Sequence, residues 1–283
     1  LTAGMRYEDV DLLNRNYTKA DPRRTGKIRI ETPNHARALL PGFGFNVKAL
    51  PILSVFGGVH KGFAPPSASL YQKAESSVNV EMGMRLTTNK MKLEAIAFNN
   101  NYSNMLGSDL AAQGGQGTLE QFNVGKAMVN GLELMFQYLP LPKHFAFQLP
   151  IQLSYTYTNT QMKNDFESSA WGHVHYGDEI PYIYKHAFNA QISLEHKRVE
   201  ANFGARFNGD MRTTPGQGKI AEREKIPAHV ILDASLKVHV NKNITISLNG
   251  INLANKKYLV SRHPSGLRAG HPLGVYGGLR LQL

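Results

Sequence analysis

The sequence predicts an all-β protein, a transmembrane antiparallel β-barrel portion of about twelve strands, from three observations. First, residues 144–158, HFAFQLPIQLSYTYT, alternate apolar and polar side chains over fifteen positions. A usual strand has about five or six residues, whereas tilted strands that cross a bilayer need roughly ten. Second, the same alternation recurs along the chain. Third, short connections alternate with long ones, which is typical of barrels with tight turns on one side of a membrane and long loops on the other.

The other predicted strands follow the same two-residue period. Their apolar faces run through residues 78–86, 188–194, 199–207, 230–240 and 275–283. Their second faces carry Asn, Gln, Glu, Lys and Arg, which a packed core does not tolerate without partners. We therefore expect the second faces to line a water-filled lumen. The apolar faces, with Phe147, Ile151 and Leu153 among them, are expected to meet lipid.

The connections between the predicted strands fall into two classes. Short turns are predicted at 47–50, 88–90, 140–143, 196–198 and 241–243, and long loops at 14–36, 62–75, 104–124, 162–182, 213–225 and 260–273. An even number of strands places both ends of the chain on the side of the short turns, which is the periplasmic side in such barrels.

Composition narrows the class of protein. Residues 1–283 contain no linker or low-complexity run, so they are predicted to form one continuous, partial barrel unit. No run of eighteen apolar residues occurs, which excludes transmembrane helices. Cysteine is absent, which excludes disulfides, zinc ribbons and thiol catalysis. Leu1 begins inside an alternating segment with no signal peptide before it, so we expect a fragment of a longer chain.

Charge and motifs exclude further functions. The formal net charge is +11, but the basic residues are scattered and no RNA-binding sheet motif occurs, so no nucleic-acid partner is expected. A positive lumen would attract an anionic solute instead. The sequence has no G-x-S-x-G, H-E-x-x-H or Gly-rich phosphate loop, so we expect no enzyme activity.

Five sequence blocks occur in an order that resembles the TonB-dependent outer-membrane receptors. They are VFGGVHKGFAPPS at 55–67, ESSVNVEMGMR at 75–85, FNVGKAMVNGLELMFQY at 122–138, GDEIPYIYKHAFNAQISL at 177–194 and LNGINLANKKYL at 248–259. The second is similar to the E-x-G-x-R block of the family. The third is similar to a family strand with Asn, Gly, Gly and Glu in register with Asn123, Gly125, Gly131 and Glu133. The segment GVHKGFAPP resembles the ferric dicitrate (FecA-type) subgroup most.

The resemblance implies that this chain is one part of a larger receptor. It implies the C-terminal half of a 22-stranded receptor barrel, with a plug domain that is absent from this chain. The implied function is active uptake of an iron chelate, ferric dicitrate by subgroup, across the bacterial outer membrane and in contact with its lipid. Energy would come from the TonB-ExbB-ExbD complex through the missing N-terminal part. No cofactor is expected, because the Fe(III) chelate is cargo. A nickel or haem receptor and a passive outer-membrane porin are the alternatives.

An anionic chelate needs cationic and amide donors, and arginine clamps carboxylates best because its planar fork matches their geometry. The ligand-binding candidates in the predicted loops are Arg23, Arg24, Arg37, Gln113, Gln116, Gln121, Arg262 and Arg268. The alternative for each of these residues is that it is a solvated loop residue without a ligand contact.

A metal site is the second candidate. His173 and His175 are two residues apart in W-G-H-V-H-Y, so they would face the same way on a strand and offer imidazole to a metal such as nickel. On a loop, the same pair is ordinary polar surface.

Overall fold

The fold is a single antiparallel wall of strands. The computed structural model describes residues 1–17, 21–27, 29–67, 72–108, 121–142, 144–168, 171–263 and 266–282, without the side chains of residues 108, 121, 122 and 168. Twelve strands pair in chain order: β1 (Thr2–Asn16), β2 (Ile30–Leu50), β3 (Leu53–Ala64), β4 (Glu75–Thr87), β5 (Met91–Ser108), β6 (Gln121–Tyr138), β8 (Ile151–Met162), β11 (His186–His196), β12 (Val199–Asn208), β15 (His229–His239), β16 (Ile244–Ile251) and β19 (Gly274–Leu281). The predicted count of about twelve is confirmed.

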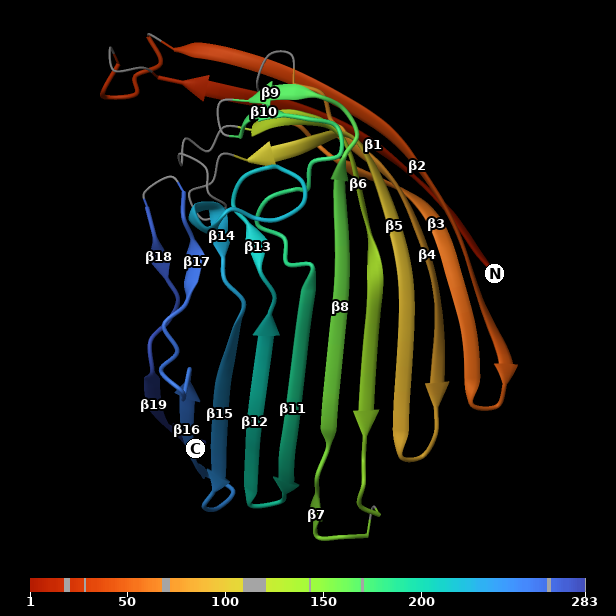
Figure 1. The fold of residues 1–283 in the computed structure, drawn as a ribbon, viewed down its shortest axis with the longest axis vertical. Helices are drawn as coiled ribbons and strands as arrows, with labels where there is room; N and C mark the ends of the chain where they lie inside the picture. The colour runs from red at the N-terminus through yellow and green to blue at the C-terminus, as the bar shows by residue number, and fades with distance from the viewer. Residues whose placement is uncertain are drawn as a thin grey trace.

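The wall is curved and open (Figure 1). In the described residues, β1 pairs only with β2 and β19 pairs only with β16, so the sheet does not close on itself. Short pairs of strands lie in the connections: β9 (Phe166–Ser168) with β10 (Gly172–Val174), β13 (Met211–Arg212) with β14 (Lys225–Ile226), and β17 (Leu259–Ser261) with β18 (Arg268–Ala269). A 3₁₀ turn at Glu222–Glu224 precedes β14. No helix in the described ranges is long and apolar enough to cross a membrane.

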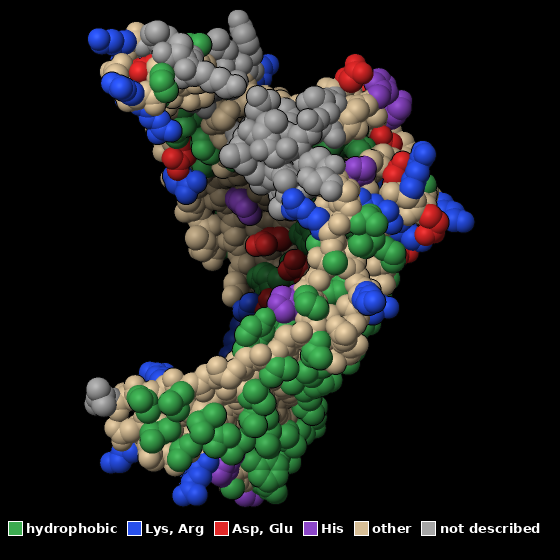
Figure 2. All heavy atoms as spheres, turned by 90° about the vertical axis from the view of Figure 1, so that its left-hand side faces the viewer, with side chains coloured by type: hydrophobic (Ala, Val, Ile, Leu, Met, Phe, Trp, Pro, Cys, Tyr) green, Lys and Arg blue, Asp and Glu red, His purple; other side chains and the backbone are tan. Residues whose placement is uncertain are grey.

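The register sorts side chains onto two faces, because the side-chain period of a strand is two. Gln137, Gln152, Gln191 and Asp233 share one face across β6, β8, β11 and β15, and we call it the hollow face. The opposite, outer face presents large apolar side chains to the surroundings, including Val80, Met82, Leu93, Phe203, Leu248 and Leu279. Figure 2 shows acidic and histidine side chains in the hollow and hydrophobic side chains over the bulging lower part.

The fifteen-residue strand predicted at 144–158 is interrupted, which corrects that prediction. β7 (Phe147–Gln148) and β8 flank Leu149 and Pro150, and both pair with β11 in one continuous register. Pro150 has no N–H for the ladder, but its carbonyl accepts the Ser193 N–H at 2.9 Å. The alternation across the interruption is therefore kept, with Ile151 and Leu153 on the outer face and Gln152 on the hollow face.

The wall has two different ends. The short-turn end holds the connections 51–52, 88–90, 139–146, 197–198 and 240–243, each within a few residues of its predicted position. The loop end holds the long connections, of which the first three are shorter than predicted because the strands extend further, and the last three are longer. The first begins after Asn16 and ends before Ile30, where we expected 14–36.

A small apolar core lies at the loop end. Val124, Ala127, Met162, Val174 and Ile180 are buried together and come from β6, β8, β10 and the segment before β11. This core packs the β9–β10 hairpin against the loop end of the wall. The connections at this end therefore have a buried apolar core, separate from the exposed apolar outer face.

Two glycines of the family-like blocks have a steric reason. A Cβ at Gly131 would lie 2.0 Å from the Tyr157 carbonyl oxygen and 2.8 Å from the Phe98 ring, and one at Gly83 would lie 2.6 Å from the Phe56 ring. An aromatic ring of a neighbouring strand covers each glycine on the hollow face, so only glycine lets the backbone and ring approach this closely.

Candidate functional site

The hollow face carries a connected polar network across three strands. Ser193 Oγ donates to Asn202 Oδ1 at 2.6 Å, Asn202 Nδ2 donates to Ser235 Oγ at 3.1 Å, and Gln191 Nε2 donates to Ser193 Oγ at 3.1 Å. Gln191, Asn202 and Ser235 line a recess of about 730 Å³ together with Asn189. The surface offers amide and hydroxyl groups to water or to a polar solute.

Ion pairs between adjacent strands lie on the same face. Arg206 contacts Asp233 at 2.8 Å, Lys237 contacts Glu200 at 2.7 Å, and Arg85 pairs with Glu94. All are partly exposed, so each contributes little to stability. They show that the hollow face is charged as well as polar, as the sequence predicts.

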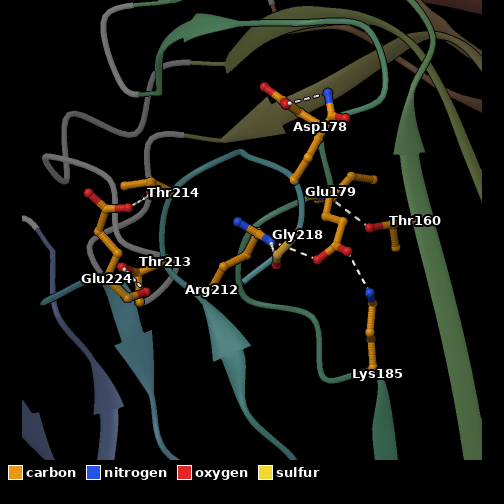
Figure 3. Close-up of polar contacts among 11 residues, drawn as sticks. Thr160, Asp178, Glu179, Lys185, Arg212, Thr213, Thr214, Gly218 and Glu224 are labelled. Atoms are coloured by element: carbon orange, nitrogen blue, oxygen red, sulfur yellow. Dashed lines mark hydrogen bonds and ion pairs between the residues drawn. The ribbon is translucent and has the colours of Figure 1, made fainter. Parts of the chain in front are cut away.

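At the loop end, a shielded ion cluster joins two connections (Figure 3). Arg212 of β13 has a side chain that is 7% exposed, and its Nε donates to Glu179 Oε2 at 2.8 Å. Its terminal nitrogen donates to the Gly218 carbonyl at 3.0 Å. Lys185 Nζ donates to the other carboxylate oxygen of Glu179. The cluster therefore ties the 209–228 connection to the segment that leads into β11.

Backbone hydrogen bonds reinforce this junction. Glu179 N–H donates to the Gly216 carbonyl and Tyr182 N–H donates to the Arg212 carbonyl, each at 2.9 Å. Thr160 of β8 accepts the Ile180 N–H at 2.9 Å. Side-chain and backbone hydrogen bonds therefore hold the connections together at the loop end of the wall, which we call its mouth.

The electrostatics of Glu179 follow from its position. Burial alone raises the pKa of a carboxyl group, but the hydrogen bonds from Lys185 and Arg212 and their positive charges outweigh burial and lower the pKa of Glu179 below its ordinary value. Glu179 is therefore ionised at neutral pH and belongs to the scaffold of the mouth rather than to proton transfer.

The predicted arginines do not converge on one point. Arg23 and Arg24 are exposed in a turn after β1, which Asp21 closes by accepting the Thr25 and Gly26 N–H groups at 3.0 and 2.8 Å. Arg24 has a φ of 52°.

Arg37 lies in β2 on the outer face, where its Nε donates to Asp9 at 3.1 Å. It therefore points away from the hollow, and its predicted ligand contact gains no support from this placement.

Arg262 and Arg268 are brought to one hairpin, β17–β18, where Ser261 pairs with Arg268. Arg262 is already engaged, because its Nε donates to the Lys225 carbonyl at 2.7 Å and its terminal nitrogen to the Glu222 carbonyl at 3.1 Å. Arg268 is exposed, and its guanidinium makes no ion pair with any described residue. The two predicted donors thus have different surroundings.

The predicted glutamines and histidines complete the set. Gln113 and Gln116 lie outside the described residues, as does the side chain of Gln121. His173 and His175 do face the same way, with ring centroids 4.5 Å apart. His175 Nδ1 is 3.9 Å from Asp178 Oδ2. Among the described residues, however, no three His, Asp or Glu side chains gather as a metal site.

Arg212 and Glu179 were missed from the sequence. Glu179 lies in a connection and Arg212 in the two-residue strand β13, neither of which has a hydrophobic period, and they are 33 residues apart, so no local pattern joins them. The only available signal was the concentration of charge in segment 177–187.

Comparison with known proteins defines the family. Residues 1–253 match the family model described as "TonB dependent receptor-like, beta-barrel". The chain therefore belongs to the TonB-dependent receptor β-barrel family, as the five sequence blocks predict.

One relative is similar in sequence over half the chain. It is the "Probable TonB-dependent siderophore receptor PiuA" of Acinetobacter baumannii, 27% identical over 149 residues, which are 50% of this chain and 19% of that protein.

Solved structures show the same fold. The siderophore receptor PiuA from Acinetobacter baumannii superposes with a TM-score of 0.72 at 17% identity, covering 99% of this chain and 40% of that one. The ferric citrate transporter FecA gives 0.71 at 17% identity, covering 98% and 42%. The ferric-catecholate import receptor Fiu of E. coli K12 gives 0.67 at 18% identity, covering 99% and 38%. The chain thus spans about 40% of the length of these structures.

Proposed function

We propose that this chain is the barrel wall of a bacterial outer-membrane receptor that takes up an anionic iron chelate with energy supplied through TonB. The observation that carries the proposal is the family match over residues 1–253 on a wall with one apolar and one polar, charged face. The named relatives are a siderophore receptor, a ferric citrate transporter and a ferric-catecholate importer, and iron-chelate import is what these names share. The partners follow from the family: membrane lipid, the TonB complex and the chelate.

Ferric dicitrate is the first ligand to test. It is an anion, and Arg268 offers it an exposed guanidinium without an ion-pair partner among the described residues. Arg262 lies one hairpin position away but holds two carbonyl groups, so it supports the hairpin that presents Arg268.

Fluorescence-quench titration of the receptor in its native length tests the assignment, with ferric dicitrate, haem and nickel as ligands. A charge-assisted hydrogen bond contributes roughly 1.5–3 kcal/mol, so R268Q should weaken ferric dicitrate binding about tenfold or more. R223Q is the matched control, because Arg223 is exposed at the same end and already lies 3.5 Å from Glu224.

The histidine pair separates the alternatives. Replacing His173 and His175 by Gln should leave ferric dicitrate binding unchanged. A loss of nickel or haem binding in that variant, with R268Q behaving as wild type, would replace the anionic chelate by a metal or haem ligand. If all variants bind every ligand with wild-type affinity, the result would contradict a ligand site at this end of the wall.

A further inference from the structure

A recess of about 730 Å³ lies at the short-turn end of the wall. Three segments form it: the β11–β12 turn, the end of β15 with its turn into β16, and the end of β19, all at one edge of the wall (Figure 1). The His239 N–H donates to the Arg198 carbonyl at 2.8 Å, and the Gln282 N–H donates to the Asn243 carbonyl at 2.9 Å. Backbone hydrogen bonds of the sheet therefore hold these segments side by side.

The register places this recess on the hollow face. His239, Thr245 and Arg280 form one row across β15, β16 and β19, and all three line the recess. His239 is six residues from Asp233 along β15, and an even spacing puts two side chains on the same face of a strand. The recess therefore opens into the same space as the polar network of Asn202 and Ser235.

The permanently charged side chains that line the recess are all cationic. They are Lys197, Arg198, Lys242 and Arg280. Each is exposed and forms no ion pair with a described residue. The side-chain amides of Asn241 and Gln282 add further hydrogen-bonding groups. The recess therefore offers several donors and no carboxylate among its described lining residues.

The carboxylates beside the recess do not cancel this charge. Glu200 accepts hydrogen bonds from Lys237 at 2.7 Å and from His239 at 2.9 Å, so it is already compensated. Glu195 lies opposite Glu200 across the β11–β12 pair. Five cationic side chains, the four of the recess and Lys237, thus face two carboxylates. Closer to the mouth, by contrast, Arg206 is paired with Asp233 at 2.8 Å.

Size and charge together define the kind of ligand. Small-molecule sites have volumes of about 300–1,000 Å³, and this recess lies within that range. Arginine and lysine bind carboxylate and phosphate oxygens through charge-assisted hydrogen bonds. The recess therefore fits a small oxyanion.

We propose that this recess binds a small oxyanion through its carboxylate or phosphate oxygens and is a second site for the anionic chelate on its way out of the barrel. The inference rests on the proposed function, which places the hollow face on the path of the chelate and the short turns at the periplasmic side. Contacts of exposed charges are weak, and a transport path needs sites that its cargo can leave. The exposed cations of the recess suit such brief binding.

Lysine footprinting of the detergent-purified receptor in its native length tests the site, with trisodium citrate as the probe. Sulfosuccinimidyl acetate acetylates exposed amines, and mass spectrometry measures the rate at each lysine. Citrate should slow the acetylation of Lys197 and Lys242, whereas sodium chloride at equal ionic strength should not. Lys219 is the control lysine, because it is exposed at the loop end, and it should react at the same rate in both salts.

A double variant tests the two arginines of the recess. R198Q/R280Q keeps both reporter lysines but removes two guanidinium groups, so half-protection should need at least about tenfold more citrate. R223Q, at the loop end, is the matched control and should give the wild-type curve. All variants are first checked for the folded, heat-modifiable gel band.

Four results would overturn the proposal. Equal protection by sodium chloride would reduce the effect to charge screening. Fast acetylation of Lys197 and Lys242 at every citrate concentration would show that the recess binds no anion. Slow acetylation without citrate would show that another part of the receptor covers the recess. Wild-type protection in R198Q/R280Q would place the anion elsewhere.

Ferric dicitrate titration of the same protein separates this site from the proposed function. A receptor that binds no chelate but keeps citrate-protected Lys197 and Lys242 would contradict the proposed function alone. A receptor that binds chelate in an Arg268-dependent way, with both lysines unprotected by citrate, would contradict the second site alone.

Discussion

Replacing Arg212 by methionine tests whether the ion cluster holds the loops at the mouth of the wall. The Arg212 guanidinium is almost fully shielded and donates to Glu179 at 2.8 Å and to the Gly218 carbonyl at 3.0 Å. Methionine keeps much of the side-chain volume but removes both hydrogen bonds. Among the described side chains, Glu179 would then retain Lys185, which is partly exposed.

The expected loss of local stability is set by the negative charge of Glu179, which Arg212 no longer compensates. Breaking a buried ion pair by removing one partner costs about 3–5 kcal/mol, because an uncompensated charge stays buried. Glu179 keeps one cation and is 19% exposed, so the low end, about 3 kcal/mol, applies. At about 1.4 kcal/mol per factor of ten, local opening should become roughly 100-fold more frequent.

Hydrogen exchange at two amides reports this opening. The N–H groups of Glu179 and Tyr182 donate to the Gly216 and Arg212 carbonyls across the junction, so their exchange should accelerate by that factor in R212M. Amides of β12 and β15 should exchange as in wild type. R206M is the matched control, because the Arg206–Asp233 pair is exposed and lies on the wall.

The double variant E179M/R212M sharpens the test. It removes both charges, and replacing a buried ion pair by apolar residues is often neutral, so much of the protection should return. Wild-type exchange rates of the Glu179 and Tyr182 amides in R212M would refute the role assigned to the cluster. Faster exchange of these amides in R206M alone would show that the Arg206–Asp233 pair, and not the cluster, holds the loops in place.

The remaining predictions concern acid and sterics. The folded pKa of Glu179 is lowered from 4.5, so its stabilisation is complete above that value and is lost as pH falls through the lower folded pKa. Exchange of the Glu179 and Tyr182 amides, corrected for intrinsic rate, should be equal at pH 7 and 5.5 and should rise only as the pH falls below 4.5; loss of protection already at pH 5.5 would contradict the sign. G131A should lose the heat-modifiable folded band, because its Cβ would meet the Tyr157 carbonyl oxygen at 2.0 Å, whereas G204A should keep the band, since its nearest neighbour is 3.8 Å away. Equal bands would show that the glycine is not required sterically.

The wall was predictable because its physics is periodic. Each strand has one apolar face and one polar face, so the two sets of side chains must alternate, and that pattern is visible in a single sequence. The interruption at Pro150 was not predicted, although its cause is local. Proline removes one ladder donor while register continues on both sides, and a pattern of side-chain polarity does not register a missing N–H.

The mouth was predictable only as a set of loops. The core around Val124, Met162 and Ile180 and the cluster of Arg212 with Glu179 join segments far apart in sequence without any period. Charge alone also could not separate Arg37, which points outward to Asp9, from Arg268, which is exposed on the β17–β18 hairpin. What a loop arginine does depends on which oxygen it reaches, and that is fixed by tertiary contacts.

The same distinction decides how arginine variants at the mouth are interpreted. Arg262 donates to the carbonyls of Lys225 and Glu222, so Gln at this position frees two backbone acceptors and loosens the β17–β18 hairpin against the 3₁₀ turn. Arg268, on the same hairpin, has no such contact with any described residue, so its replacement removes charge without removing a structural hydrogen bond found there. A loss of chelate binding in R262Q alone would therefore indicate a displaced hairpin. A loss in R268Q, with the hairpin amides exchanging as in wild type, would indicate direct contact with the anion.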